Sequence, residues 1–443
     1  MEKNIVENKI LVTGSSGYVG GRLVPKLLKL NYDIRVLVRN SSRIENKLWS
    51  KNVDIFEGNV FNPKTLEGLF DGVKVAYYLI HSMENKKDFV KSDLKAANNF
   101  ARLASKAGVH KIIYLGGLAD ENSSLSDHLK SRHDTGKELA KYKSSVVEFR
   151  ANVIVGSGSL SFEMIRNLTE RIPVMICPQW VYTKTQPISI SNVLEYLVRA
   201  LTLKTNKNLI IEIGGKDTLT YGQMIEKYAQ VRGLKRYLIP VPVLTPKLSS
   251  YWVHWTTPLS ANITKPLVEG LKNESIVKNK TADKYFPDVN LLSYSEAVEK
   301  AILNFNQKSI ETSWTDSLVS SNGNDSQVSS VLKEGLIIET RKVKVRSSKE
   351  QIFKVISSIG GDNGWYYANF LWSIRGYIDL LVGGVGLRRG RTHPSKLKQG
   401  EALDFWRVEK IIANNLLRLK AEMKLPGKAW LEYEIIKDQS DLI

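Results

Sequence analysis

The chain has 443 residues, an ordinary apolar share of 42%, and 64 lysines and arginines against 45 aspartates and glutamates, for a formal net charge of +19. This length exceeds the size at which a single hydrophobic core stops growing, so we expect two or three domains. The single cysteine excludes an internal disulfide and favours a reducing compartment.

The positive charge is spread along the whole chain rather than gathered in a basic arm. The sequence has no zinc-ligand spacing and no RNA-recognition aromatic signature, so we expect neither a metal nor a nucleic-acid partner. Peripheral contact with an anionic membrane and membership of a protein complex stay open. The longest apolar run, residues 370–387, is interrupted by Arg375, Asp379 and several glycines and is a poor membrane span. The N-terminus leads almost directly into a strand, which leaves no room for a signal peptide and predicts a cytoplasmic protein.

Residues 10–22 combine a short apolar strand, a glycine-rich turn and the start of a helix. Gly14 permits a tight turn, Gly17 permits close approach of a pyrophosphate, and Gly20 permits the helix to pack on the sheet. The N-terminus of the helix offers backbone N–H groups to phosphates. We therefore predict a dinucleotide site whose turn residues are Gly14, Ser15, Ser16, Gly17, Tyr18, Val19 and Gly20.

The second predicted strand, residues 32–39, decides which cofactor the site prefers. A site for NAD(H) needs a carboxylate at the end of this strand, whereas the 2′-phosphate of NADP(H) needs cationic partners. The strand ends in Arg39 and is followed by Asn40, Ser41, Ser42 and Arg43. These two arginines favour NADP(H) over NAD(H); an arginine exposed on a loop is the alternative interpretation.

Further strands are predicted at residues 53–58, 73–80 and 111–115, with helices at 62–70 and 88–107 between them. Strands that alternate with helices at this spacing predict an α/β fold with a Rossmann-type doubly wound parallel sheet. The ligand crevice of such a sheet lies at the carboxyl ends of its strands. We expect Gly14, Arg39, His81 and Gly116 to gather there.

The segment Thr13-Gly-Ser-Ser-Gly-Tyr-Val-Gly20 resembles the TGxxGxxG motif of the extended short-chain dehydrogenases/reductases. Together with residues 77–83, 114–118, 131–133 and 156–162, it resembles an atypical, nucleoside-diphosphate-sugar epimerase-like subgroup of that superfamily, related to the accessory nucleotide-binding subunit of respiratory complex I. The resemblance covers about residues 8–305. It implies an NAD(P)-binding domain over residues 1–310, with the substrate lobe mainly in residues 155–305.

The resemblance also implies further cofactor contacts. Asn59 and Val60 stand where the family has Gly-Asp-Val touching adenine, and residues 149–156 resemble the strand that runs past the nicotinamide. His81 is implied to face the nicotinamide, with packing or helix capping as the alternative. The implied cofactor residues beyond the turn are Arg39, Arg43, Asn59, Val60, Leu79, Ile80, His81, Gly116, Lys137, Ala151 and Ile154.

The catalytic groups depart from the family pattern. In Tyr-x-x-x-Lys the tyrosine position is His133, followed by Lys137, and the serine position falls on Gly116-Gly117. A histidine can pass protons near neutral pH, and the resemblance implies that Lys137 binds the cofactor ribose. Two hypotheses stay open. One is a reductase or isomerase of an unknown small molecule with His133 and Lys137 as catalytic residues; the other is a non-catalytic NAD(P)-binding scaffold or redox sensor in a complex or at a membrane surface.

In the substrate lobe, Cys177 lies in the apolar run 174–178 and is predicted to be a core thiol. The sequence becomes helical from residue 217, and the prolines of residues 239–246 interrupt that pattern. An aromatic cluster follows at residues 251–255. Aromatic residues at this spacing are typical of a core, and a ligand pocket is the alternative.

Residues 311–331 are rich in serine, asparagine and glycine and are predicted to be a flexible linker. A second domain, residues 332–443, begins with a predicted strand at 337–345 and a helix that opens at the capping box Ser347–Glu350 and runs to about Ile359. Strands are predicted at residues 403–411, 417–425 and 429–436, with a hairpin turn at Pro426-Gly427.

This order of elements resembles the helix-grip fold of polyketide cyclases and START domains. Residues 383–391 and 403–408 resemble an uncharacterised domain that is fused behind the same subgroup. No helix is evident after the last predicted strand, so we expect an α+β helix-grip-like domain that lacks its final helix. The basic run 387–391 indicates either an anion-binding segment or a solvated loop.

Overall fold

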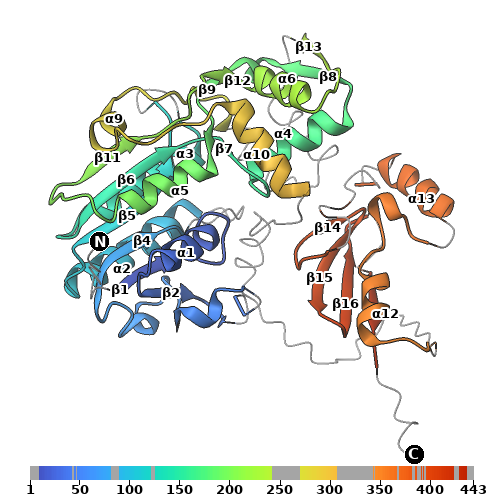
Figure 1. Ribbon diagram of the computed structural model, residues 1–443, viewed down its shortest axis with the longest axis horizontal. Coiled ribbons are helices and arrows are strands. Elements are labelled where there is room, and N and C mark those ends of the chain that lie inside the picture. Colours follow the sequence, from blue (N-terminus) through green and yellow to red (C-terminus); the bar gives the residue numbers. More distant parts are fainter. Residues whose placement is uncertain are drawn as a thin grey trace, which may run out of the picture. The chain divides into compact units, whose positions relative to one another are not determined.

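The computed structural model describes residues 9–41, 44–45, 47–80, 89–120, 125–241, 270–306, 343, 345–366, 369–381, 385–386, 391, 393, 396–423 and 429–436. The chain divides into two compact units, Met1–Ser321 and Asn322–Ile443 (Figure 1). The division falls within the predicted linker, residues 311–331, which itself lies outside the described residues.

A seven-stranded sheet forms the centre of the first unit, in the order β11-β6-β5-β4-β1-β2-β3. Every pairing in it is parallel. The strand order reverses next to β1, which is the switch point where ligands bind in doubly wound sheets. The prediction of a Rossmann-type sheet is confirmed. The strands are β1 Lys9–Thr13, β2 Ile34–Val38, β3 Asp54–Glu57, β4 Val73–Tyr78, β5 Lys111–Gly117, β6 Ser145–Ala151 and β11 Leu209–Glu212.

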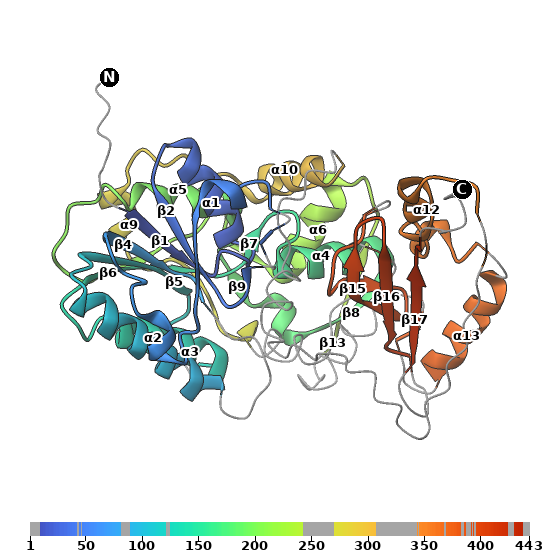
Figure 2. The same cartoon turned by 90° about the horizontal axis from the view of Figure 1, so that it is seen from below.

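Helices cover both faces of this sheet. Figure 2 shows α1 (Gly20–Lys29) and α5 (Ile190–Arg199) on one face and α2 (Phe89–Lys106) and α3 (Asp127–Leu139) on the other. Leu23 and Leu27 of α1 pack with Val36 in one core, and Phe100 of α2 packs with Tyr78 in the other. The apolar residues of the central strands are therefore buried from both sides, as a parallel sheet requires.

Two predicted elements differ from the structure. The helix expected at residues 62–70 is only a short 3₁₀ helix, Pro63–Leu66, because Gly68 adopts a φ of +78° that no right-handed helix permits. Strand β5 does not end at Leu115 but continues through Gly116 and Gly117, which pair with Arg150 and Ala151 of β6. The two glycines therefore belong to the strand, which is longer than predicted.

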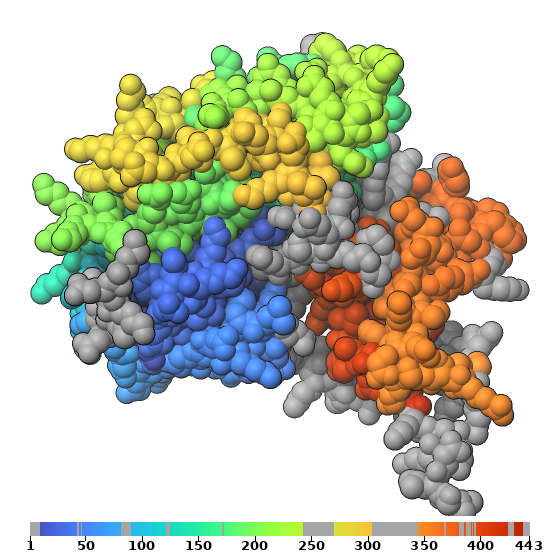
Figure 3. Space-filling model, viewed as in Figure 1, coloured from blue at the N-terminus to red at the C-terminus, as the bar shows by residue number. Residues whose placement is uncertain are grey.

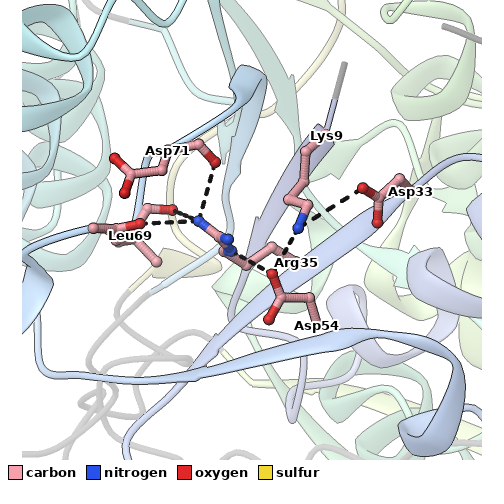
Figure 4. Close-up of polar contacts among 7 residues, drawn as sticks. Lys9, Asp33, Arg35, Asp54, Leu69 and Asp71 are labelled. Atoms are coloured by element: carbon pink, nitrogen blue, oxygen red, sulfur yellow. Dashed lines mark hydrogen bonds and ion pairs between the residues drawn. The ribbon is translucent and has the colours of Figure 1, made fainter. Parts of the chain in front are cut away.

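An ionic cluster connects the amino ends of strands β1, β2 and β3 (Figure 4). The Asp54 carboxylate lies 2.8 Å from both Lys9 Nζ and Arg35 Nε. Arg35 also donates to the backbone carbonyl of Leu69 at 2.8 Å and to that of Asp71 at 3.2 Å. The cluster thereby connects β1, β2 and β3 to the loop that precedes β4.

In the part of the first unit predicted to be the substrate lobe, the described residues form three two-stranded sheets, β10-β7, β12-β9 and β13-β8, packed with helices. Its core includes Phe162, Met224, Tyr228 and Val298. The elements are β7 Ile154–Val155, α4 Leu160–Arg171, β8 Val174–Pro178, η4 Gln179–Tyr182, β9 Lys184–Thr185, β10 Ile188–Ser189, β12 Leu219–Thr220, α6 Tyr221–Val231, β13 Tyr237–Val241, α9 Thr281–Tyr285 and α10 Tyr294–Asn306.

Two predictions for this lobe are tested by β8 and β13. Cys177 is buried, and burial raises the pKa of its thiol to about 11, so the prediction of a core thiol is confirmed. The proline-rich stretch that was expected only to interrupt a helix instead begins inside β13, where Pro240 pairs in register with Cys177. Among the described residues β13 pairs with β8 alone, and an edge strand tolerates proline. The aromatic cluster 251–255 lies outside the described residues.

The second unit contains an antiparallel sheet in the order β14-β15-β16-β17. Its core includes Trp365, Phe405, Trp406 and Leu419. This is the separate α+β domain that was predicted. Its elements are α12 Lys349–Ile356, η5 Gly361–Asn363, α13 Asn369–Leu381, β14 Ala402–Leu403, β15 Trp406–Ile412, β16 Leu416–Ala421 and β17 Trp430–Glu434.

Two details of this unit were predicted wrongly. The helix cap is Ser348 and not Ser347, because the Ser348 hydroxyl accepts the N–H of Gln351 at 3.2 Å. The strand expected at 403–411 is broken at Asp404, which has a φ of +51° and accepts the indole N–H of Trp365 at 2.8 Å. The Pro426-Gly427 turn and most of the strand at 337–345 lie outside the described residues.

The apolar run 370–387 forms α13 in its first part. Within the described ranges, no helix is both long enough and apolar enough to cross a membrane. From the basic run 387–391 only Arg391 is described, and it donates to the carbonyls of Ser357, Ile359 and His393. The Arg391 side chain therefore connects the segment around Ser357 and Ile359 to the segment around His393 by hydrogen bonds.

Candidate cofactor site

The turn between β1 and α1 has room only for glycine at two positions. Gly14 has a φ of +66°, and a Cβ on it would stand 2.5 Å from the carbonyl oxygen of Leu79. A Cβ on Gly20 would overlap the Gly14 carbonyl. The turn is closed by the N–H of Gly17, which donates to Gly14 O at 2.9 Å. The backbone of the turn thus packs directly against the end of β4.

The same turn has the features of a phosphate cradle. Helix α1 starts at Gly20 with no side-chain cap from Val19 and no acidic residue in its first turn. The Ser15 side chain is fully buried, and its hydroxyl has no hydrogen-bond partner in the described structure. A pyrophosphate oxygen would satisfy this donor and would face the positive end of the helix dipole. The residues present therefore fit a dinucleotide.

Arg39 stands at the expected place, directly after β2, with its side chain exposed. On the neighbouring strand, Glu57 accepts the N–H of Ser41 at 2.6 Å, and hydrogen bonding to Ser41 lowers the pKa of the Glu57 carboxyl. This carboxylate holds the loop after β2 in place beside Arg39. Arg43 lies outside the described residues.

Asn59 and Val60 follow β3. The Asn59 Oδ1 accepts the N–H of Phe61 at 3.1 Å, and the Asn59 N–H donates to Thr65 Oγ1 at 2.9 Å. The Val60 side chain is buried in the core, and its carbonyl accepts from Asn99 at 2.9 Å. The side-chain oxygen of Asn59 is thus engaged in its own loop.

Leu79 and Ile80 follow β4. Thr13 links β1 to β4, because its hydroxyl donates to Tyr77 O at 2.9 Å and accepts from the N–H of Leu79 at 3.1 Å. Leu79 is therefore fixed against the glycine-rich turn. His81 lies outside the described residues.

His133 and Lys137 lie one turn apart on α3 and differ in burial. His133 is buried, and its Nε2 lies 2.9 Å from the carbonyl oxygen of Gly117. Because a carbonyl only accepts, Nε2 must carry the proton. Lys137 is 66% exposed, and its Nζ lies 3.9 Å from Asp134 Oδ1.

A buried ion pair that sequence reasoning missed lies beside Gly116. Arg150 Nε donates to Glu148 Oε1 at 2.8 Å, and the two side chains are only 4% and 5% exposed. A Cβ on Gly116 would stand 2.9 Å from Glu148 Oε1, and a Cβ on Gly136 would overlap the same carboxylate. Two charged residues at alternate positions of an otherwise apolar strand were the available signal, since they share one face of β6.

The carboxyl ends of the central strands bring several predicted residues together. Gly14 follows β1, Arg39 follows β2 and Leu79 follows β4, while Gly116-Gly117 end β5 beside Ala151 of β6. Ile154 begins β7, and its carbonyl accepts from Ser159 at 2.7 Å. In the described part of the chain, no three histidine, cysteine or acidic side chains are grouped to hold a metal.

Comparison with known sequences agrees with this arrangement. Residues 6–144 match the NmrA-like family, and residues 333–441 match a protein family of unknown function, DUF2867. A ceramide reductase of Caulobacter vibrioides is 23% identical over 239 residues, which cover 53% of this chain and 73% of that protein. A putative dihydroflavonol 4-reductase of Synechocystis is 31% identical over 112 residues, which cover 24% of this chain and 32% of that protein.

Solved structures show the same fold for about two thirds of the chain. Triphenylmethane reductase of Citrobacter has a TM-score of 0.55 at 19% identity and covers 67% of this chain and 99% of its own. UDP-glucose 4-epimerase of Thermotoga maritima, solved with UDP-glucose, has a TM-score of 0.52 at 14% identity and covers 68% and 99%. The enzyme WbmG of Bordetella bronchiseptica, solved with NAD and UDP, has a TM-score of 0.53 at 14% identity and covers 69% and 96%.

The first unit thus has the Rossmann-type fold of NAD(P)-dependent epimerases and reductases. The matches support an NmrA-like member of this class, the atypical short-chain dehydrogenases/reductases, for the N-terminal part, and a DUF2867 domain is present at residues 333–441. A relation to the complex I subunit and a helix-grip fold for residues 332–443 stay predictions.

Proposed function

We propose that the first unit binds NADP(H) in preference to NAD(H) and reduces or isomerises a small organic molecule. The observation that carries the proposal is the turn from Gly14 to Gly20, where close backbone packing, an uncapped helix start and the buried Ser15 hydroxyl meet. When bound, the nicotinamide supplies hydride transfer. The names of the relatives, which include reductases and an epimerase, support a carbonyl or sugar substrate.

In this proposal, separate residues of the protein bind the cofactor and donate the proton. The glycine-rich turn holds the pyrophosphate, Arg39 together with Arg43 faces the 2′-phosphate, and Lys137 turns from Asp134 to the ribose. His133 carries a proton on Nε2, and donation of that proton to a substrate would break its bond to Gly117 O. The cysteine content supports a reducing compartment, and a cytoplasmic location is part of the proposal.

A second candidate is a non-catalytic NAD(P)-binding scaffold or redox sensor, in a protein complex or at an anionic membrane. The observation that favours it is the packing at Gly116, where the Glu148 carboxylate fills the space next to the expected serine position. Neither Gly116 nor Gly117 offers a hydroxyl to polarise a substrate. Binding without turnover would then be the function of the site.

Single-turnover oxidation of NADPH decides between the two candidates. The protein is mixed with NADPH and a quinone or an enone, and separately with NADP⁺ and a nucleotide sugar; NADPH absorbance and sugar epimers are followed. We expect turnover with one of these substrate classes, and loss of that turnover in His133→Ala while NADPH still binds. Tight NADPH binding without reaction in all three classes would favour the scaffold, and turnover that survives in His133→Ala would remove the proton-donor role.

A further inference from the structure

A pocket of about 270 Å³ lies between α1, α5 and α10, and none of the turn residues from Gly14 to Gly20 lines it. In Figure 3 the blue surface of the N-terminal segment borders the green and yellow surfaces to which α5 and α10 belong. We call it the α1–α10 pocket. Its lining also includes Val155 and Gly156, at the end of the segment 149–156 that resembles the strand running past the nicotinamide, so the pocket adjoins the candidate cofactor site on the side away from the glycine-rich turn.

Four cationic side chains line the α1–α10 pocket. Arg22, Lys26 and Lys29 come from α1, where their spacing places them on one face of the helix, and Lys300 comes from α10. Among the described lining residues there is no aspartate or glutamate. Cationic side chains that line one pocket contribute positive potential to it, and a positive potential attracts an anion.

Arg22 is the fixed part of this cluster. Its side chain belongs to a residue only 6% exposed, and Nη2 donates to the carbonyl of Ser157 at 2.7 Å. The guanidinium carbon lies 4.7 Å from the centre of the Tyr18 ring. A guanidinium held from two sides loses little side-chain entropy when it binds a ligand.

The wall formed by α5 offers hydroxyl groups and a helix N-terminus. Ser189 caps α5 by accepting the N–H of Ser191 at 3.2 Å, and the two hydroxyl oxygens lie 2.7 Å apart. Both serines line the α1–α10 pocket, as does Ser157. The positive end of the α5 dipole therefore adds to the field of the four cations.

We propose that the α1–α10 pocket is a second ligand site, which binds a small phosphate monoester. A phosphate dianion matches the cationic lining, and its oxygens accept from guanidinium, ammonium and hydroxyl donors. The volume of about 270 Å³ is slightly below the range of about 300–1,000 Å³ that is usual for drug-sized ligands, so it suits a small phosphate monoester. Pro25, Leu194 and Ala297 line the apolar side and would contact a short carbon chain.

Calorimetric titration with glycerol 3-phosphate tests the site, in phosphate-free buffer at constant ionic strength and with NADPH at saturation. Glycerol is the neutral control ligand. We expect 1:1 binding of glycerol 3-phosphate, and at least about tenfold weaker binding in the double variant Lys29→Gln/Lys300→Gln, since each lost cation removes a charge-assisted contact. The matched double variant Lys51→Gln/Lys64→Gln, with the same change of net charge outside the pocket, should bind as the unaltered protein does.

The NADPH affinity of both double variants should be unchanged, which separates this site from the cofactor site. Loss of glycerol 3-phosphate binding when NADPH is added would place the phosphate in the cofactor cradle and overturn the proposal. Equal weakening in both double variants, or no binding to the unaltered protein, would also overturn it. If the protein bound no NADPH, the comparison of the two double variants without NADPH would still decide the question.

Discussion

The carboxylate of Glu148 lies so close to Gly116 that a Cβ on Gly116 would stand 2.9 Å from Glu148 Oε1. The same carboxylate lies against Gly136 of α3 and is paired with Arg150. Glu148 thereby connects β5, β6 and α3 beneath the expected serine position. Glycine at position 116 is therefore required by the packing, and it also lacks the hydroxyl that the family's serine would supply.

Gly136→Ala should destabilise the protein by about 1–3 kcal/mol, because the new methyl group would overlap the Glu148 carboxylate. Alanine in a helix interior normally stabilises by about 1 kcal/mol relative to glycine, so the expected sign is reversed. Gly222→Ala in α6 is the matched control, since the nearest atoms to its Cβ lie 3.4 Å away. The free energy of unfolding in urea measures both, and equal stabilisation in the two variants would show that Glu148 is free to move.

Gly14→Ala should abolish most dinucleotide binding, because its Cβ would meet Leu79 O at 2.5 Å and deform the turn. Gly72→Ala is the control, since Gly72 has a similar φ of +74° but no atom within 4 Å of its Cβ. Both variants carry a backbone strain of about 1–2 kcal/mol. Only Gly14→Ala should lower the NADPH affinity, and an equal loss in both would mean that general instability is responsible.

Arg39→Ala should weaken NADPH by about tenfold or more and leave NADH nearly unchanged, since a lost guanidinium–phosphate contact costs about 1.5–3 kcal/mol. Fluorescence titration of the two cofactors gives the ratio directly. Arg236→Ala, an arginine in the substrate lobe bonded to backbone carbonyls, controls for the change in charge. Parallel weakening of NADPH and NADH by Arg39→Ala would contradict a role at the 2′-phosphate.

Asp54 should contribute stability that disappears in acid. Its hydrogen bonds to Lys9 and Arg35 lower the pKa of the carboxyl below the ordinary value of 3.8 (Figure 4). A lowered folded-state pKa stabilises above the unfolded-state pKa and is lost as the pH falls through the folded-state value. The protein should have a larger unfolding free energy than Asp54→Asn. This difference should be constant from neutral pH to about pH 5 and should disappear as the pH falls below the ordinary pKa. Because the carboxylate is 37% exposed, the difference should not exceed about 1 kcal/mol.

The parts of the fold that were predictable are those in which local pattern and tertiary packing agree. Strands β2 and β4 bury both faces, so their apolar runs stand out in the sequence. The glycine-rich turn was found because all of its residues are adjacent in the chain. The helix cap was misplaced by one residue because Ser347 and Ser348 are both good caps and only the geometry at Gln351 distinguishes them.

The missed features depend on contacts between distant segments. Gly116 and Gly117 have the composition of a turn, yet β6 supplies a complete ladder that keeps them in β5. The charge on Glu148 is tolerated in the core only because Arg150 pairs with it and because Gly116 and Gly136 leave room. None of these conditions is visible in the residues next to Glu148. For the same reason, the sequence indicated a candidate phosphate cradle but left the catalytic end of the candidate site open.

The central claim is that the turn from Gly14 to Gly20 holds NADP(H), and equilibrium titration of the protein with NADPH and with NADH tests it most directly. We expect saturable 1:1 binding of both cofactors, with NADPH at least about tenfold tighter because of one additional phosphate–arginine contact. Absence of binding by either cofactor, or tighter binding of NADH than of NADPH, would contradict the account.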